Sequence, residues 1–278
     1  MKSLSLTRNP NYFLASEKSF DDFDKINIII VPEKETSTFS FNQCLINIIE
    51  TDLKNIGKFK RYTKEINKTT NELEFIYLNP KNNIFSIEQL RKAFLNIFDV
   101  DYIRQKIYIN DLSKSLLNTQ PEKYDKDSIK KIISNCDIKS SLKILVNANN
   151  IKRENTAIFI QKKLADYNIN SVINKKSFSE YQAAFNNKDY DIFIGGFNLE
   201  TCFDYDKLFA SGNIFGYEDS VTNNKWQNVK HALTKAEFDS AIADLNNSMK
   251  SSFLVIIGSR NKKILFNIKA TPSLLELF

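Results

Sequence analysis

The sequence predicts an α/β protein organised around a mostly parallel sheet. Three observations between residues 142 and 200 predict this class: three short apolar runs, two amphipathic helical stretches, and the regular alternation of the two. The apolar runs cover residues 142–146, 169–173 and 191–197. A strand, helix, strand, helix, strand order requires right-handed crossovers, and such sheets bind ligands beyond the carboxyl ends of their strands. The loop that begins at Phe197 is therefore the first candidate for a functional site.

Both helices between these strands carry a clear helical signal. Ala157, Ile160 and Leu164 recur at intervals of three and four residues, which places them on one face of the first helix. Ser177 and Glu180 form an S-x-x-E capping box that opens the second helix. The two helices are therefore predicted to bury one face each.

The third strand carries the pair Gly195-Gly196 near its end. Because glycine tolerates backbone conformations that other residues avoid, the pair predicts that the chain leaves the sheet sharply there. It lacks the helix-opening spacing of a dinucleotide-binding loop, so we interpret it as backbone geometry.

The first 85 residues are predicted to be rich in strands, with one helix. Alternating or continuous apolar residues predict strands at 3–7, 25–31 and 72–78. A turn is expected at Asn9-Pro10-Asn11, and residues 35–50 predict a helix that passes into a short strand.

From residue 86 the pattern becomes helical. Ser86 and Gln89 form a second capping box, followed by apolar residues at helical spacing, so residues 86–98 are predicted to form a helix. Asp99 or Asp101 can cap the next helix. The remaining predictions are helices at 125–134, from Tyr205, at 225–233 and at 235–250, and closing strands at 253–258 and 263–268.

Composition describes a globular chain with a lysine-rich surface. With 278 residues, of which 42% are hydrophobic, the chain can bury a substantial core. The net charge of +6 would permit an acidic partner such as nucleic acid. However, the lysines are scattered among 33 acidic residues and form no basic cluster with aromatic residues, which favours a solvated surface and no nucleic-acid partner.

The residues that usually carry metal or redox chemistry are sparse. Cys44, Cys136 and Cys202 are odd in number and widely spaced, which indicates neither a disulfide framework nor a zinc site. The single histidine, His231, lies in a polar helical stretch typical of a surface position. No phosphate-binding glycine loop or nucleophile elbow occurs, so the sequence predicts no cofactor and no enzyme activity.

The sequence contains no apolar segment long enough to span a membrane. Residues 1–4 lack the apolar core of a signal peptide. Taken alone, the chain is expected to stay where it is made.

Several segments resemble family 5 extracellular solute-binding proteins, the oligopeptide and dipeptide receptors of ABC importers. LKILVN, IFIQKKLADYNI and DYDIFIGGFN are similar to the carboxyl-terminal lobe of that family. TRNPNYF, ELEFIYLNPKN and IEQLRKAFLNIFDVDYI resemble earlier segments of it. The order and spacing agree over essentially the whole chain.

The resemblance implies a type II periplasmic-binding-protein fold of which this chain has the second half. Residues 86–252 would form the complete carboxyl-terminal α/β lobe with a mixed sheet, and residues 1–85 with 253–278 a remnant of the first lobe. The resemblance also implies binding of short peptides between two lobes, delivery to ABC permease subunits, and an extracellular location. Membrane attachment would depend on the family's lipid anchor, which this chain is expected to lack.

The resemblance places a ligand site in the loop after the third strand. The family's "W..DY.DP" loop corresponds to FNLETCFD, with Phe for Trp, Glu for Asp and no Pro. By this likeness Glu200 would pair with the free amino terminus of a peptide, because a desolvated carboxylate can hold an ammonium group. Phe197, Asn198, Thr201 and Asn79 are the other expected ligand-binding residues. Alternatively, Glu200 is an ordinary solvated carboxylate and Phe197 a core aromatic residue.

Two rival hypotheses remain open. A degenerate or regulatory binding module would sense a ligand or partner without delivering cargo, and the altered cleft loop favours it. A basic nucleic-acid-binding domain is the second rival. Since half of the cleft would be missing, the isolated chain is expected to bind peptides weakly or not at all.

Overall fold

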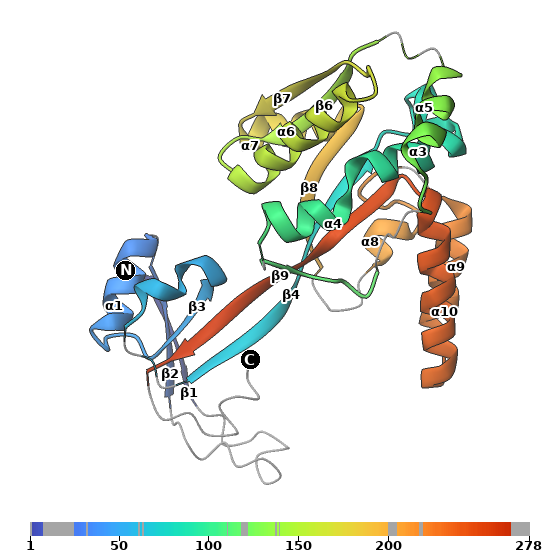
Figure 1. Ribbon diagram of the computed structural model, residues 1–278. Coiled ribbons are helices and arrows are strands. Elements are labelled where there is room, and N and C mark those ends of the chain that lie inside the picture. Colours follow the sequence, from blue (N-terminus) through green and yellow to red (C-terminus); the bar gives the residue numbers. More distant parts are fainter. Residues whose placement is uncertain are drawn as a thin grey trace. The chain divides into compact units, whose positions relative to one another are not determined.

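The computed structural model describes residues 2–7, 25–31, 33–60, 62, 64–109, 111–117, 122–136, 138, 140–199, 205–216 and 219–267. The chain divides into two compact units: unit 1 is Met1–Thr70 with Asn261–Phe278, and unit 2 is Asn71–Arg260. Both divisions fall inside long strands, β4 (Lys64–Leu78) and β9 (Leu254–Phe266), as Figure 1 shows. These units are not the lobes expected from the sequence, and the assignment of residues 86–252 to one lobe and of residues 1–85 with 253–278 to the other stays a prediction.

Seven of the described strands form one mixed sheet. Their order is β3-β9-β4-β8-β6-β7, and β5 pairs with β9 outside this path. β6 (Leu142–Asn147) runs parallel to both β7 (Ser171–Lys176) and β8 (Ile192–Asn198). β4 pairs with β8 in the antiparallel sense. The predicted α/β class is therefore confirmed. The expectation of a mostly parallel sheet holds only for β6, β7 and β8, because β4 joins β8, and β3 and β5 join β9, in the antiparallel sense.

The central alternation of strands and helices folds as its periodicity predicts. Ile144 on β6 is fully buried and lies opposite Ile173 on β7 and Ile192 on β8. Helices α6 (Ile151–Ala165) and α7 (Phe178–Asn186) pack against these strands. Because both faces of β6 are covered, its apolar run is continuous instead of alternating.

The predicted local signals of α6 and α7 are confirmed. Ala157, Ile160 and Leu164 are fully buried along one face of α6. At the start of α7, the Ser177 hydroxyl donates to Glu180 Oε2 at 2.6 Å and the Ser177 amide donates to the same oxygen at 3.1 Å. The capping box therefore satisfies donors at the helix start that would otherwise lack a partner.

The second predicted capping box is wrong. The Asn82 side chain accepts a hydrogen bond from the Ile84 amide at 2.9 Å, which begins a short helix, α2 (Asn83–Ser86), one turn early. Ser86 ends that helix, and its hydroxyl donates to the Asn83 carbonyl at 2.6 Å. The long helix α3 (Glu88–Phe98) starts after Ile87 without a side-chain cap.

The other helices of unit 2 largely follow the sequence. Asp99 caps the next helix by accepting from the Tyr102 amide at 3.2 Å. The helix predicted at 225–233 begins earlier because Asp219 accepts from the Val221 amide at 3.1 Å. The bounds are α4 (Val100–Tyr102), the π-helical turn η2 (Ile103–Ile107), α5 (Lys126–Ser134), α8 (Asp206–Phe209), α9 (Ser220–Lys230), α10 (Lys235–Ser248) and the 3₁₀ turn η3 (Met249–Ser251).

Two strand predictions need correction. The closing strands expected at 253–258 and 263–268 are one strand, β9, because its polar middle still has pairing partners: Arg260 lies opposite Leu112 of β5 (Leu112–Ser113), and Lys262 opposite Asp52 of β3 (Ile48–Asp52). The strand expected at 72–78 begins at Lys64. Polar residues interrupt the apolar pattern from which a strand is predicted. They do not interrupt the strand itself, because its backbone still pairs with neighbouring strands.

Unit 1 has little apolar core of its own. β1 (Lys2–Thr7) and β2 (Lys25–Ile30) form a two-stranded antiparallel sheet. The helix α1 (Lys34–Asn42), β3 and the 3₁₀ turn η1 (Leu53–Lys58) confirm the predicted passage from helix to strand. Phe41, Phe59 and Leu265 form one small buried cluster. The turn expected at residues 9–11 lies outside the described residues.

Trp226, the single tryptophan of the chain, reports on the folding of unit 2. It is 2% exposed and its Nε1 donates to Asp206 Oδ1 at 2.7 Å. We expect Ile144→Ala to lower the free energy of unfolding by about 2–5 kcal/mol, because it leaves a cavity in the apolar core that packs on the face of β6. Urea titration followed by Trp226 fluorescence measures this loss.

Val172→Ala is the matched control on the adjacent edge strand β7. Val172 is 57% exposed, so the same measurement should change by less than about 0.5 kcal/mol. Equal losses for the two variants would contradict the burial of β6 between its neighbours.

Candidate functional site

The carboxyl ends of β6, β7 and β8 lie at one edge of the sheet, where α/β proteins bind ligands. The glycine pair near the end of β8 does not turn the chain out of the sheet, contrary to the sequence prediction. Gly195 and Gly196 both remain in strand β8 and pair with Phe75 and Glu74 of β4. Their role is to leave space for the side chains that cross the strand.

A buried cluster of charged groups lies at this edge, centred on Glu74, which is 1% exposed. Arg153 of α6 donates from Nε to Glu74 Oε2 at 2.8 Å and from Nη2 to Oε1 at 3.0 Å. Arg260 of β9 donates from Nε and Nη2 to Oε1 at 2.9 and 2.6 Å. The Tyr108 hydroxyl donates to Oε2 at 3.1 Å. Both carboxylate oxygens are therefore held by several donors.

Gly196 is required for this geometry. A Cβ built on it would collide with Arg153 Nη2 and would lie 2.8 Å from the Leu73 carbonyl oxygen and 3.0 Å from Glu74 Oε1. The guanidinium group of Arg153 thus lies across the backbone of β8 where any other residue would place a side chain. Its Nη1 continues to Asn147 Oδ1, 3.2 Å away at the end of β6.

The charges of the cluster support one another electrostatically. Burial lowers the pKa of Arg153, but the hydrogen bonds and charge of Glu74 outweigh it and leave that pKa above its ordinary value. The pKa of Arg260 is raised for the same reasons. Burial, and then the charge of Glu74, raises the pKa of Tyr108 well above its ordinary value. All three donors therefore keep their protons at neutral pH.

The cluster can hold the strands together and fix the edge of the sheet at which they end. Sequence reasoning missed Glu74, Arg153 and Arg260. One signal could have found the first: Glu74 interrupts the apolar run of a strand in which its neighbours Leu73 and Phe75 are both buried. A charge in such a position needs buried partners.

Of the residues expected to bind ligand, Phe197 and Asn198 lie together at the end of β8. Phe197 is half-buried, and Lys207 Nζ lies 5.7 Å from the centroid of its ring. Asn198 is exposed and pairs with Glu72 of β4. Both positions adjoin the charged cluster.

Asn79 is not part of this group. It follows β4 at the opposite end of β8 and is 5% exposed. Its side-chain amide donates to the carbonyl oxygens of Lys188 at 3.2 Å and Tyr190 at 2.7 Å, which ties together two turns. Glu200 and Thr201 lie outside the described residues.

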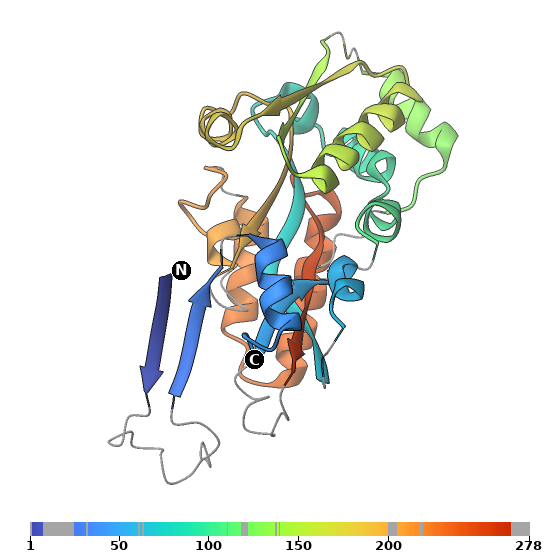
Figure 2. The same cartoon turned by 90° about the vertical axis from the view of Figure 1, so that its left-hand side faces the viewer.

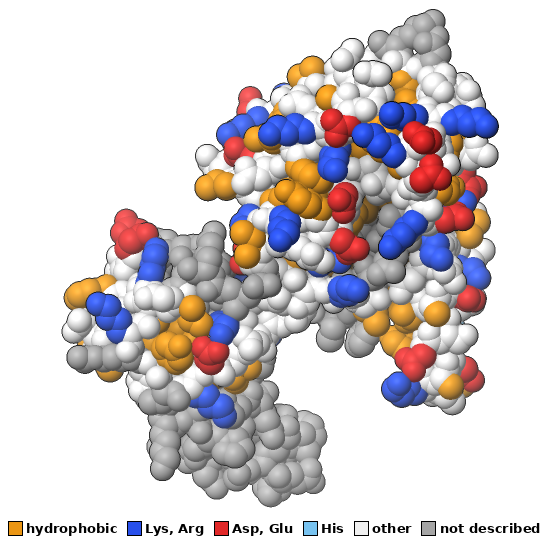
Figure 3. All heavy atoms as spheres, viewed as in Figure 1, with side chains coloured by type: hydrophobic (Ala, Val, Ile, Leu, Met, Phe, Trp, Pro, Cys, Tyr) orange, Lys and Arg blue, Asp and Glu red, His pale blue; other side chains and the backbone are white. Residues whose placement is uncertain are grey.

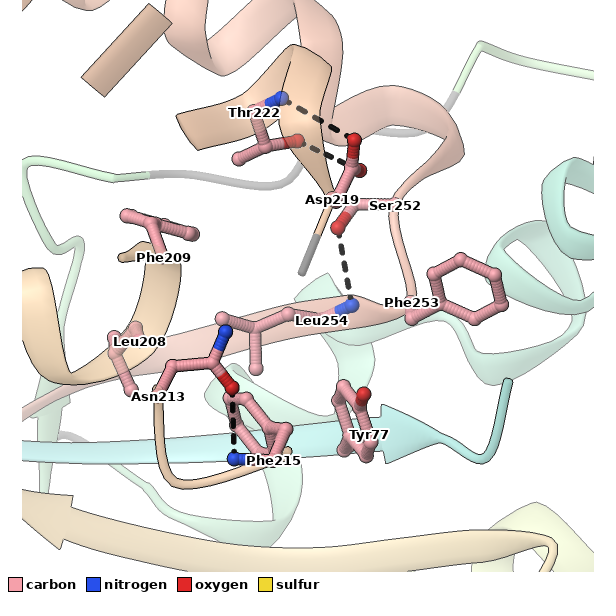
Figure 4. A pocket seen from close by; sticks show the side chains of 10 residues that line it. All are labelled: Tyr77, Leu208, Phe209, Asn213, Phe215, Asp219, Thr222, Ser252, Phe253 and Leu254. Atoms are coloured by element: carbon pink, nitrogen blue, oxygen red, sulfur yellow. Dashed lines mark hydrogen bonds between the residues drawn. The ribbon is translucent and has the colours of Figure 1, made fainter. Parts of the chain in front are cut away.

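The pockets of unit 2 are small. The one in Figure 4 has a volume of about 20 Å³, enough for one water molecule. Its wall includes the rings of Tyr77 and Phe215, stacked with centroids 3.9 Å apart. A second hollow of about 200 Å³ adjoins Asn79 and is lined by charged side chains that include Lys143 and Asp189, themselves 2.7 Å apart. Neither pocket has the size of a ligand site.

The charged side chains and the helices of the described residues bear on metal and membrane binding. Figure 3 shows basic and acidic side chains interspersed on the visible face. Within the residues described, no group of three or more potential ligands could hold a metal ion. The helices among them are all too short or too polar to cross a membrane.

Solved structures of substrate-binding and peptide-binding proteins share this fold. The substrate-binding protein CtaP of Listeria monocytogenes matches 96% of this chain with a TM-score of 0.76 and 16% identity, and the chain covers 59% of it. The putative peptide-binding protein AppA of Clostridium difficile matches 99% of this chain with a TM-score of 0.72 and 17% identity, and the chain covers 63% of it. The oligopeptide-binding protein AppA of Bacillus subtilis, solved with a nonapeptide, matches 90% of this chain with a TM-score of 0.65 and 15% identity, and the chain covers 58% of it. The chain thus spans about three fifths of these type II periplasmic binding proteins.

We expect Glu74→Gln to lower the free energy of unfolding by about 3–5 kcal/mol, because two buried guanidinium groups would lose their counter-charge. Asp189→Asn is the control, since the Lys143–Asp189 pair is about half exposed and should cost less than about 1 kcal/mol. Urea unfolding followed by Trp226 fluorescence compares them, and similar losses would show that the cluster is not structurally important.

No curated protein matches this sequence. A family model does match, the one described as "Bacterial extracellular solute-binding proteins, family 5 Middle", over residues 1–211. Members of this family are binding proteins and not enzymes. The match covers most of the chain and agrees with the fold of the solved structures, so the chain belongs to the family 5 bacterial extracellular solute-binding proteins.

Proposed function

We propose that this chain is part of the peptide-binding component of an ABC importer. The match of residues 1–211 to the solute-binding family carries the proposal. The likeness of the fold to a receptor solved with a nonapeptide supports the choice of peptides among possible solutes. In this role the protein would act outside the membrane and deliver its ligand to permease subunits.

The mechanism would be capture between two lobes. Peptide recognition by main-chain hydrogen bonds gives affinity for many sequences, and wet side-chain pockets tolerate variation. Closure of the lobes is a hinge motion, and the closed form would be the one that the permease recognises. Since the chain spans about three fifths of the matched receptors, it would supply only part of the cleft.

Within this scheme the loop after β8 would hold the amino terminus of the peptide. Glu200 would accept a charge-assisted hydrogen bond from the ammonium group, and Phe197 and Asn198, at the end of β8, would flank it. The Glu74 cluster supports this role, because it pins the strand from which the loop emerges. Thr201 is proposed as a further contact, whereas the side-chain amide of Asn79 donates to the Tyr190 carbonyl oxygen.

The second candidate function is a degenerate or regulatory module that binds without transport. The departures of the loop FNLETCFD from the family pattern favour it: Phe for Trp, Glu for Asp and no Pro. A protein that binds a single peptide ligand but does not deliver it to permease subunits would be such a module and not an importer component.

Calorimetry with a mixed pool of di- to hexapeptides tests the proposal. The isolated chain should bind more weakly than about 1 mM, because much of the cleft is absent. The chain joined to a complete first lobe, taken from the coding sequence upstream, should bind at about micromolar affinity. Micromolar binding by the isolated chain would contradict the incomplete cleft, and no binding by the joined protein would rule out a peptide receptor.

The role of Glu200 has its own test in the joined protein. Glu200→Gln should weaken binding of peptides with a free amino terminus by about thirtyfold, roughly 2 kcal/mol. Peptides acetylated at the amino terminus should bind both proteins equally. Glu154→Gln, on α6, is the control variant and should leave both peptide classes unaffected. Equal losses for free and acetylated peptides would remove Glu200 from the ammonium site.

A further inference from the structure

The turn after η2 presents an isoleucine in a strained backbone conformation. Ile109 has a φ of +42°, in the left-handed region that β-branched residues avoid because their side chains crowd the backbone there. Its side chain gains little burial in return, since it is 60% exposed. The contacts of the described residues therefore give no structural reason for an apolar side chain at this position.

This turn is fixed to the charged cluster on both sides. Before it, the Tyr108 hydroxyl donates to Glu74 Oε2 at 3.1 Å. After it, Leu112 of β5 lies opposite Arg260, whose Nη2 donates to Glu74 Oε1 at 2.6 Å. The strands that carry Glu74 and Arg260 are neighbours in the sheet, and Figure 2 shows them side by side, β4 in cyan and β9 in red. Ile109 is thus held near the candidate site.

Lys152 connects the same turn to the start of α6. Its Nζ donates to the Ile107 carbonyl oxygen at 2.5 Å and lies 3.6 Å from Asp111 Oδ2. The residue before it, Ile151, is the first residue of α6 and is 71% exposed. One lysine therefore fixes the segments of two exposed isoleucines, Ile109 and Ile151, where α6 follows β6.

The exposed apolar surface of these two residues is continuous with the proposed ligand site. Neither isoleucine belongs to the buried apolar clusters of the described residues. Arg153, the next residue of α6, extends its Nη2 to Gly196, the residue before Phe197. Covering apolar surface that is otherwise in water is favourable. The occupant that the proposed function supplies at this place is a side chain of the bound peptide.

We propose that Ile109 and Ile151 contact an apolar side chain of the bound peptide and thereby favour peptides that carry one. This inference rests on the proposed function, because it takes the ligand to be a peptide. It adds a chemical preference, for an apolar over a charged side chain at one position of the peptide. It also gives the strained backbone of Ile109 a role, since strain is kept where a site needs a particular side chain.

The test uses the joined protein and calorimetry with a matched set of peptides: tetraalanine, and tetraalanine with one alanine replaced by leucine or by aspartate at each position. At one position, the leucine peptide should bind at least about tenfold more tightly than the aspartate peptide. In the double variant Ile109→Asn with Ile151→Asn, this difference should fall below about threefold. Tetraalanine should bind both proteins about equally.

Two further variants separate an apolar contact from a change in folding. Ile109→Val with Ile151→Val keeps both side chains apolar and should keep the preference for leucine. Ile158→Asn removes an isoleucine that is 45% exposed further along α6, and it should keep the preference too. Ile109→Asn should not lower the melting temperature of the isolated chain, because asparagine tolerates the left-handed conformation. A decrease of more than about 4 °C would assign the side chain to the fold.

Three results overturn the inference while the proposed function stands: the leucine and aspartate peptides bind the wild-type protein equally at every position, the double asparagine variant keeps the preference, or that variant weakens tetraalanine as much as the leucine peptide. In each of them, binding of tetraalanine to the wild-type joined protein still supports a peptide receptor. If no peptide of the set binds the joined protein, the proposed function fails and this inference fails with it. The two failures are therefore distinguishable.

Discussion

The buried carboxylate of Glu74 holds together the elements at the edge of the sheet where the candidate site lies. Glu74 on β4 accepts hydrogen bonds from Arg153 on α6, Arg260 on β9 and Tyr108 after η2. Moving a charge out of water is costly, so this arrangement is favourable only while every partner is present. It also specifies register: if β4 slipped by one residue against β8, Glu74 would no longer face Gly196, and a charge would point into apolar surroundings.

Under the proposed function, these contacts hold in place the strands that precede the loop after β8. Arg153 bonds both Glu74 of β4 and Asn147 at the end of β6, so these two strands are connected across β8, which lies between them. Binding sites gain precision when the groups that carry them are held by such contacts, because less ordering is needed when the ligand arrives.

Local patterns predicted much of this fold and part of its site. The capping box at Ser177 and the buried stripe of α6 depend on residues three or four positions apart, which sequence spacing reveals directly. The strand order predicts a ligand site in the loop after β8; Phe197 and Asn198 lie at the end of that strand, and their contact with a ligand stays a prediction. The ligand contact expected of Asn79 stays a prediction, and its amide donates to the carbonyl oxygens of Lys188 and Tyr190, more than a hundred residues away.

The sequence by itself determined the alternation of strands and helices, since the period of apolar residues decides which face each element buries. Only the tertiary structure decided that β9 continues through its polar middle and that Glu74 is charge-paired. Its arginine partners lie 79 and 186 residues away. The tertiary structure alone also decided that the apolar side chains of β1 and β2 are exposed. The physical reason is that periodicity is a property of neighbours, whereas burial and pairing depend on which distant segment lies alongside.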